Sequence, residues 1–138
     1  MSTSKNKAAL RRVYEEVFNK GNLAIIPELI AKDFVFDSPI GKYHGQDGFK
    51  QMIAATRVAF PDIHFTVDDM VVEGDKVAVR LSIRGTFKGK FGDFEPTGKQ
   101  INMTAAYFYR FKDGKEAEVT PVDPHALYRA LGIPIPPG

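Results

Sequence analysis

The sequence contains no cysteine, and its charges nearly cancel. Without cysteine, disulfides, thiolate chemistry and Cys-based metal sites are excluded. The 19 basic and 17 acidic residues are scattered and leave a formal net charge of +2, so the chain offers no basic field for nucleic acid. No apolar run approaches the roughly 20 residues that cross a bilayer, and the N-terminus lacks the apolar core of a secretory signal. We therefore expect a cytoplasmic protein that binds neither nucleic acid nor membranes.

Apolar and aromatic residues are plentiful. Of the 138 residues, 43% are apolar, and the chain has 11 Phe and 5 Tyr. This length and composition suit a single globular domain with one core, here taken as residues 1–138. Aromatic side chains fill cores, and they also form the walls of small-molecule pockets. The composition is therefore compatible with a protein that binds a small organic molecule.

The first part of the chain has helical periodicity. A helix is predicted over residues 4–19, because its apolar residues recur at helical spacing on one face: Leu10, Val13, Tyr14, Val17 and Phe18. Gly21 ends this helix, and a second, short helix is predicted over residues 23–31. A third helix is predicted over residues 46–59 and is ended by Pro61.

The remainder has the alternation of strands. One strand, residues 33–37, and a short strand near Tyr43 both precede the third helix. Further strands are predicted over residues 63–68, 77–84, 101–111 and 115–122, with hairpin turns at 73–75 and at Asp113-Gly114. A final short helix, 123–131, begins with Asp123 as its cap, and residues 133–138 form an extended Pro-rich tail. The order predicts an α+β fold in which three N-terminal helices pack on a strongly curved antiparallel sheet.

Four segments of the chain, in their order along the sequence, resemble the NTF2-like superfamily, and their sequences are most similar to its SnoaL-like, polyketide cyclase-like members. They are VYEEVFNKGNLAIIPELIAKDFVFDSP, AFPDIHFTVDDMVVEGDKVAVR, PTGKQINMTAAYFYRFKDGK and VDPHALYRALG. The resemblance implies a cone-shaped domain with an apolar pocket for a small molecule. It also implies a homodimer that pairs through the outer sheet face, where Arg80, Ser82 and Arg84 are expected.

The acid/base constellation of the polyketide cyclases is absent as the sequences align. Those enzymes carry an Asp on the last strand, just after a Trp, and a polar partner on the preceding strand. Here Pro121 stands at the Asp position, Thr120 at the Trp position and Tyr107 at the partner position. Proline cannot transfer a proton. The only acid nearby is Asp123.

A second resemblance, to the ketosteroid isomerases of the same superfamily, suggests a site. It places Tyr14 at the position of an oxyanion donor, Asp37 at that of the general base and Tyr107 at that of the second donor. Each has a structural alternative: Tyr14 and Tyr107 as core residues, and Asp37 in a strand-end turn with Ser38. The expected pocket wall consists of Phe18, Val35, Met52, Phe87, Met103 and Ala105.

These features favour an enzyme that transfers protons on an apolar carbonyl compound, as isomerases and cyclases do. No cofactor is required, and no metal is expected, because His44, His64 and His125 lack ligand spacing. Two alternatives stay open: a non-catalytic protein that binds a small hydrophobic ligand, and a module that serves only dimerisation.

Overall fold

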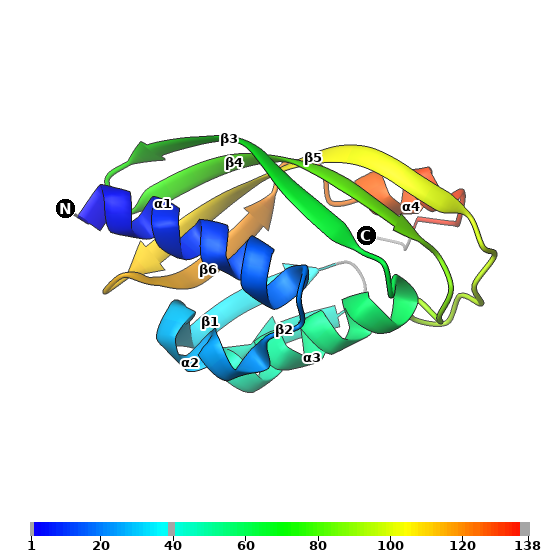
Figure 1. Cartoon of the computed structure of the whole chain (residues 1–138), viewed down its shortest axis with the longest axis horizontal. Coiled ribbons are helices and arrows are strands. Elements are labelled where there is room, and N and C mark those ends of the chain that lie inside the picture. The colour runs from blue at the N-terminus through cyan, green and yellow to red at the C-terminus, as the bar shows by residue number, and fades with distance from the viewer. Residues whose placement is uncertain (1, 39–40, 136–138) are drawn as a thin grey trace.

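The helices and strands follow the predicted order, with a few changed boundaries (Figure 1). The structure is a computed structural model that describes residues 2–38 and 41–135. The helical elements are α1 (Ser2–Arg12), a π-helix (Val13–Phe18), a 3-10 turn (Leu23–Ile25), α2 (Ile26–Leu29), α3 (Gly45–Ala59) and α4 (Ala126–Leu131). The strands are β1 (Ile30–Ser38), β2 (Gly41–His44), β3 (His64–Glu73), β4 (Lys76–Thr86), β5 (Gln100–Lys112) and β6 (Lys115–Pro121).

The first helix buries the predicted apolar stripe, but its last part has π rather than α geometry. The amide of Asn19 donates to the carbonyl of Tyr14 at 3.0 Å, a bond that spans five residues instead of four. Val13, Tyr14, Val17 and Phe18 are all buried in this wider turn. Such π segments occur often at functional sites. The π turn carries Tyr14 and Phe18 into the interior together.

The second predicted helix is shorter than expected. Helical structure ends at Leu29, and the backbone of Ile30 is already extended, with φ −115° and ψ 130°. Pro27 is tolerated because it lies in the first turn, where its missing N–H has no helical partner. Ile30 pairs with Glu116 of β6, so burial in the sheet determines the state of this β-branched residue.

The six strands form one sheet in the order β2-β1-β6-β5-β4-β3. All neighbours are antiparallel except β1 and β6, which run parallel, so the expectation of a wholly antiparallel sheet needs this one correction. No helical crossover joins this pair directly, because β2 to β5 lie between them in the chain. Figure 1 shows the curved sheet arching over α1, α2 and α3, while α4 lies at one end. The α+β class, with helices packed on a curved sheet, is confirmed.

The C-terminal helix begins later than predicted. It starts at Ala126, and Asp123 lies in the turn before it, where its carboxylate accepts the amide of His125 at 3.1 Å and pairs with Arg129. Asp123 is therefore not the cap residue of α4. Gly132 ends the helix in the left-handed conformation. The tail prediction for residues 136–138 lies outside the described residues. No helix in the described part of the chain is long and apolar enough to cross a membrane.

The outer face of the sheet carries exposed apolar side chains. Phe108 of β5 is 54% exposed and pairs with Ala78 of β4, which in turn pairs with exposed Val71 of β3. Arg80 lies on the same face, because it pairs with Ala106. An apolar patch framed by charges is typical of association surfaces. The homodimer stays a prediction, and this face is where we expect it to form.

Phe108→Lys is expected to weaken association, because it places a charge in the centre of the patch. Sedimentation equilibrium at high micromolar concentration should give twice the monomer mass for the unchanged protein and a lower mass for the variant. A monomeric mass for the unchanged protein would remove the prediction.

Candidate active site

A cavity of about 330 Å³ lies between the helices and the inner face of the sheet. This volume is at the lower end of the range for small-molecule sites. Its wall is mainly apolar and includes Phe18, Phe49, Met52, Phe65, Met103 and Val119. Lys90, Gly92 and Asp123 also line it and are exposed, so the cavity reaches solvent beside the loop of residues 87–98 and the start of α4. The arrangement suits an apolar molecule that enters from this end.

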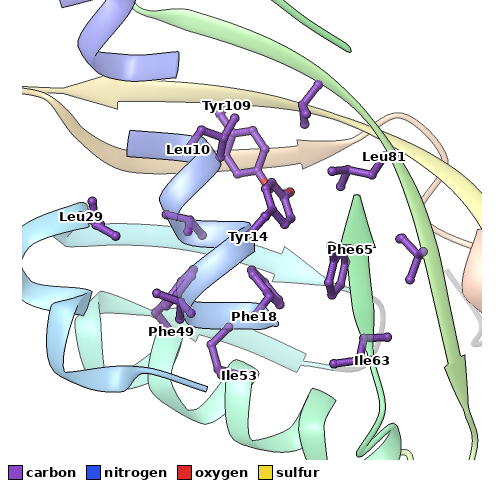
Figure 2. Close-up of a cluster of buried hydrophobic side chains, with 14 of the residues drawn as sticks. Leu10, Tyr14, Phe18, Leu29, Phe49, Ile53, Ile63, Phe65, Leu81 and Tyr109 are labelled. Carbon is purple, nitrogen blue, oxygen red and sulfur yellow. The ribbon is translucent and has the colours of Figure 1, made fainter. Parts of the chain in front are cut away.

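Two buried tyrosines meet at the inner end of the cavity. The hydroxyls of Tyr14 and Tyr109 are hydrogen-bonded to each other, as Figure 2 shows. Burial is the main cause that raises the pKa of both phenols well above 10, and the charge of the neighbouring Glu116 adds to it. Both therefore stay protonated. One hydroxyl proton joins the two oxygens, so the other can be donated to a bound molecule.

Glu116 is the unexpected member of this end of the cavity. Its side chain is only 2% exposed and lines the cavity, and its Oε2 atom has no hydrogen-bond partner within the described residues. Burial raises the pKa of this carboxyl to about 8. A buried carboxyl without a partner is costly to the fold, and such groups cluster at functional sites. Glu116 is therefore the strongest candidate for an acid/base group in this protein.

A β-bulge in β6 turns Glu116 inward. Val119 pairs with Tyr109 and Glu118 with Arg110, but the next partner, Phe111, pairs with Glu116, so Ala117 is an extra residue. Because side chains alternate along a strand, one extra residue reverses the face of everything beyond it. In the unbroken pattern KEAEV, Glu116 would share the solvent face with Glu118. No signal in that pattern distinguishes the two glutamates, which is why sequence reasoning missed Glu116.

The predicted base, Asp37, does not face the cavity. Its side chain is 57% exposed, and its Oδ1 contacts Nε2 of His44 at 3.0 Å on the neighbouring strand. Phe36 and Ser38, on either side of Asp37, line the cavity, so strand alternation directs Asp37 to the opposite face. The expectation that Asp37 lies across the cavity from the tyrosines is wrong.

The other expected residues divide into two groups. Tyr14, Tyr107, Phe18, Met52 and Met103 all line the cavity, although the hydroxyl of Tyr14 meets Tyr109 rather than Tyr107. The remaining three do not line it: Val35, Phe87 and Ala105.

Each of the three misses has a local cause. Val35 shares the outward face of β1 with Asp37 and is exposed. Phe87 is fully buried in the core, where its ring packs 5.7 Å from that of Phe60. The short side chain of Ala105 does not reach the cavity, and Ala105 instead borders a separate hollow beside Arg129 of α4.

Two positions near the end of β6 bear on the resemblance to polyketide cyclases. Pro121, at the position of the cyclase Asp, does line the cavity and pairs with Tyr107. Asp123 lines it at the mouth, where its hydrogen bond with Arg129 lowers the pKa of its carboxyl. Asp123 is thus an ionised, paired carboxylate and a weaker base than Glu116. No cluster of three or more metal-ligating side chains occurs in residues 2–38 and 41–135.

Comparisons with known proteins agree with the architecture. IdmH from Streptomyces antibioticus, a candidate polyketide cyclase, is 33% identical over 93% of this chain and 99% of its own, with a TM-score of 0.74. AclR from Streptomyces galilaeus, a candidate hydroxylase, is 26% identical over 94% of this chain and 86% of its own, with a TM-score of 0.73. A SnoaL-like protein from Jannaschia sp. CCS1 shares the fold at a TM-score of 0.83 and 21% identity, over 96% and 94% of the two chains.

No protein with a curated description matches the sequence. The model of one family does match, and it covers residues 8–131, nearly the whole of the described domain. The helices, the curved sheet and the cavity between them all lie within that range. The chain belongs to the family of SnoaL-like polyketide cyclases.

Proposed function

We propose that this protein is an enzyme that transfers protons on an apolar, carbonyl-bearing molecule without a cofactor. The observation that carries the proposal is the Glu116 carboxyl, whose Oε2 has no hydrogen-bond partner among the described residues and which lies at the inner end of the cavity, beside the Tyr14–Tyr109 pair. Membership of a family of polyketide cyclases supports this chemistry. In this proposal Glu116 takes the part of the base that the sequence had suggested for Asp37.

The reaction begins with removal of a proton from the carbon next to the substrate carbonyl. The Glu116 carboxylate accepts that proton, and the C–H electrons form the enolate C=C bond while the carbonyl oxygen gains negative charge. The free hydroxyl proton of the Tyr14–Tyr109 pair hydrogen-bonds that oxygen, as donors in an oxyanion hole do. Where a C=C bond adjoins that carbon, the enolate is conjugated, and protonated Glu116 returns the proton to the far carbon of the C=C bond; the double bond moves next to the carbonyl, which gives an isomerisation. Alternatively, the enolate carbon attacks a second carbonyl, and Glu116 protonates the new alkoxide, which gives a ring closure.

Burial makes Glu116 well suited to this task. A carboxylate in bulk water, with a pKa near 4, is a poor base, whereas the catalytic pKa is best near the operating pH. Burial raises the pKa of Glu116 to about 8, so a fraction is ionised at neutral pH and that fraction is a strong base. The wall of the cavity is mainly apolar and aromatic, and hydrogen bonds to the developing enolate are stronger in such a low-dielectric setting.

One observation favours a different class of function. Pro121 occupies the cavity position where the resemblance to cyclases expects an acid/base Asp, and proline transfers no proton. A protein of this family that binds a small apolar molecule without changing it would tolerate such a residue. The two functions differ in whether a bound ketone loses protons to the protein.

Hydrogen–deuterium exchange at carbon tests the proposal without knowledge of the natural substrate. The protein is mixed in D₂O with 2-tetralone, an apolar ketone with acidic protons beside its carbonyl, and deuterium uptake is followed by NMR. The enzyme should accelerate exchange well above the buffer rate. Binding of 2-tetralone without accelerated exchange would support the non-catalytic alternative.

Asp37→Asn is expected to leave the exchange rate unchanged within about twofold, because Asp37 faces solvent and its carboxylate contacts His44 rather than the cavity. Rates of 2-tetralone exchange for the variant and the unchanged protein provide the measurement. A loss of ten-fold or more would restore Asp37 as the base and contradict the assignment to Glu116.

A further inference from the structure

A second buried polar group lies in the cavity wall, at its other end. Tyr128 of α4 is 2% exposed and lines the cavity, and its hydroxyl has no hydrogen-bond partner within the described part of the chain. Its ring packs edge-on against Phe91 of the loop beside the mouth, with 5.8 Å between the ring centres. Buried tyrosine hydroxyls are usually hydrogen-bonded, so this one calls for an explanation.

Tyr43 of β2 supplies a second phenol in the wall of the same cavity. It is half-buried and lines the cavity. Burial is the main cause that raises the pKa of Tyr128, and the phenol of Tyr43 raises it further. Two phenols therefore line the cavity, in addition to the charged Lys90 and Asp123 at its mouth.

The position of Tyr128 is separate from the site at Glu116. Glu116 is the second residue of β6, and α4 follows the end of that strand. At about 3.3 Å per residue, the five steps from Glu116 to Pro121 correspond to ~16 Å of extended strand. Figure 1 shows β6 running from the far hairpin towards the end of the molecule that carries α4. The cavity thus has polar groups at both ends and aromatic walls between them.

We propose that Tyr128 and Tyr43 form a second polar subsite, and that the ligand carries a carbonyl or hydroxyl oxygen at each end of an apolar skeleton. The catalytic role of the inner site rests on the proposed function. The outer subsite does not depend on it, because it is argued from the burial of Tyr128 and its contact with Phe91. A ligand oxygen at the outer end would give the Tyr128 hydroxyl the partner that it lacks among the described residues. The subsite would thereby select elongated molecules with two oxygen functions over those with one.

Two rod-shaped probes test the subsite by equilibrium binding. 4-Hydroxystilbene has one hydroxyl, and 4,4′-dihydroxystilbene has a hydroxyl at each end of the same skeleton. Calorimetric titration of the unchanged protein should show the dihydroxy probe binding about fivefold to tenfold more tightly, which is the usual worth of one neutral hydrogen bond. Equal affinities for the two probes would overturn the proposal.

Tyr128→Phe should remove this preference while leaving the affinity for 4-hydroxystilbene unchanged. The same variant should have a higher Tm, because it deletes a buried hydroxyl without a partner. A lower Tm with weaker binding of both probes would mean that Tyr128 serves only the fold, and a retained preference would mean that its hydroxyl does not meet the ligand. Either result overturns the proposal.

Glu116→Gln is the matched control at the opposite end. It should keep the preference for the dihydroxy probe, because the outer subsite is intact. If Glu116→Gln retains the exchange rate of 2-tetralone while Tyr128→Phe loses the preference, the proposed function fails and the subsite stands. A preference lost in Glu116→Gln but kept in Tyr128→Phe would place the selective contact at the inner end and overturn the subsite.

Discussion

Replacing Glu116 by glutamine is expected to lower the rate of deuterium exchange on 2-tetralone by about 10²–10⁴-fold, the usual contribution of general-base catalysis. Glutamine has nearly the same shape and fills the same buried position, but its amide cannot accept the carbon-bound proton. The measurement is the exchange rate at a fixed concentration of ketone, followed by NMR, after circular dichroism has established that the variant is folded.

Glu118→Gln is the matched control, because Glu118 lies two residues further along the same strand. Its carboxylate is half-exposed and pairs with Arg110 at 2.7 Å on the solvent side. This change should leave the exchange rate within about twofold of the unchanged protein. Full exchange in Glu116→Gln, or equal losses in both variants, would refute the assignment of Glu116 as the base.

The hydroxyl pair should be less sensitive than the base. In Tyr14→Phe the hydroxyl of Tyr109 loses its partner and can turn its own proton to the substrate, so one donor survives. We therefore expect a loss below the 10²–10³-fold that follows removal of a sole oxyanion donor.

The exchange rate of the unchanged protein should rise with pH through about 8, as the Glu116 carboxyl ionises. A rate that falls over this range would assign Glu116 the role of an acid.

The second large expected effect concerns stability. The pKa of Glu116 is raised from 4.5 to about 8 in the folded protein. Since the folded form holds its proton more tightly than the unfolded chain, this carboxyl contributes full stability below pH 4.5. Its contribution decreases as the pH rises from 4.5 and levels off above about 8, where both states are ionised. One pH unit between the two pKa values corresponds to about 1.4 kcal/mol, so the whole loss is ~5 kcal/mol.

Urea unfolding at pH 5 and at pH 8.5 measures this effect. The free energy of unfolding of the unchanged protein should fall by several kcal/mol between the two values, an amount comparable to the total stability of many domains. Glu116→Gln has no proton to lose, so its stability should change much less, and the difference between the two proteins isolates this group. Parallel pH dependences for the two proteins would show that Glu116 is not buried as described.

The local pattern of the sequence determined much of the architecture. The apolar stripe from Leu10 to Phe18 predicted the buried face of the first helix, and the alternation in residues 77–84 predicted β4 with its inner and outer faces. Both predictions rest on periods of 3.6 and 2 residues, which are properties of the backbone itself. The same alternation separates Phe36 from Asp37. The resemblance to ketosteroid isomerases suggested Asp37 as a pocket residue, but the structure places it on the solvent side of β1.

The tertiary structure alone decided which carboxyl enters the cavity. Glu116 faces inward only because Ala117 is bulged out of register against β5, and that bulge depends on pairing with residues on separate segments. Likewise, Ile30 leaves the predicted helix because it pairs with β6, more than eighty residues further along the chain. A period read from consecutive residues carries no information about such distant partners. The sequence by itself therefore determined the elements and their buried faces, whereas the register between distant strands decided the candidate site.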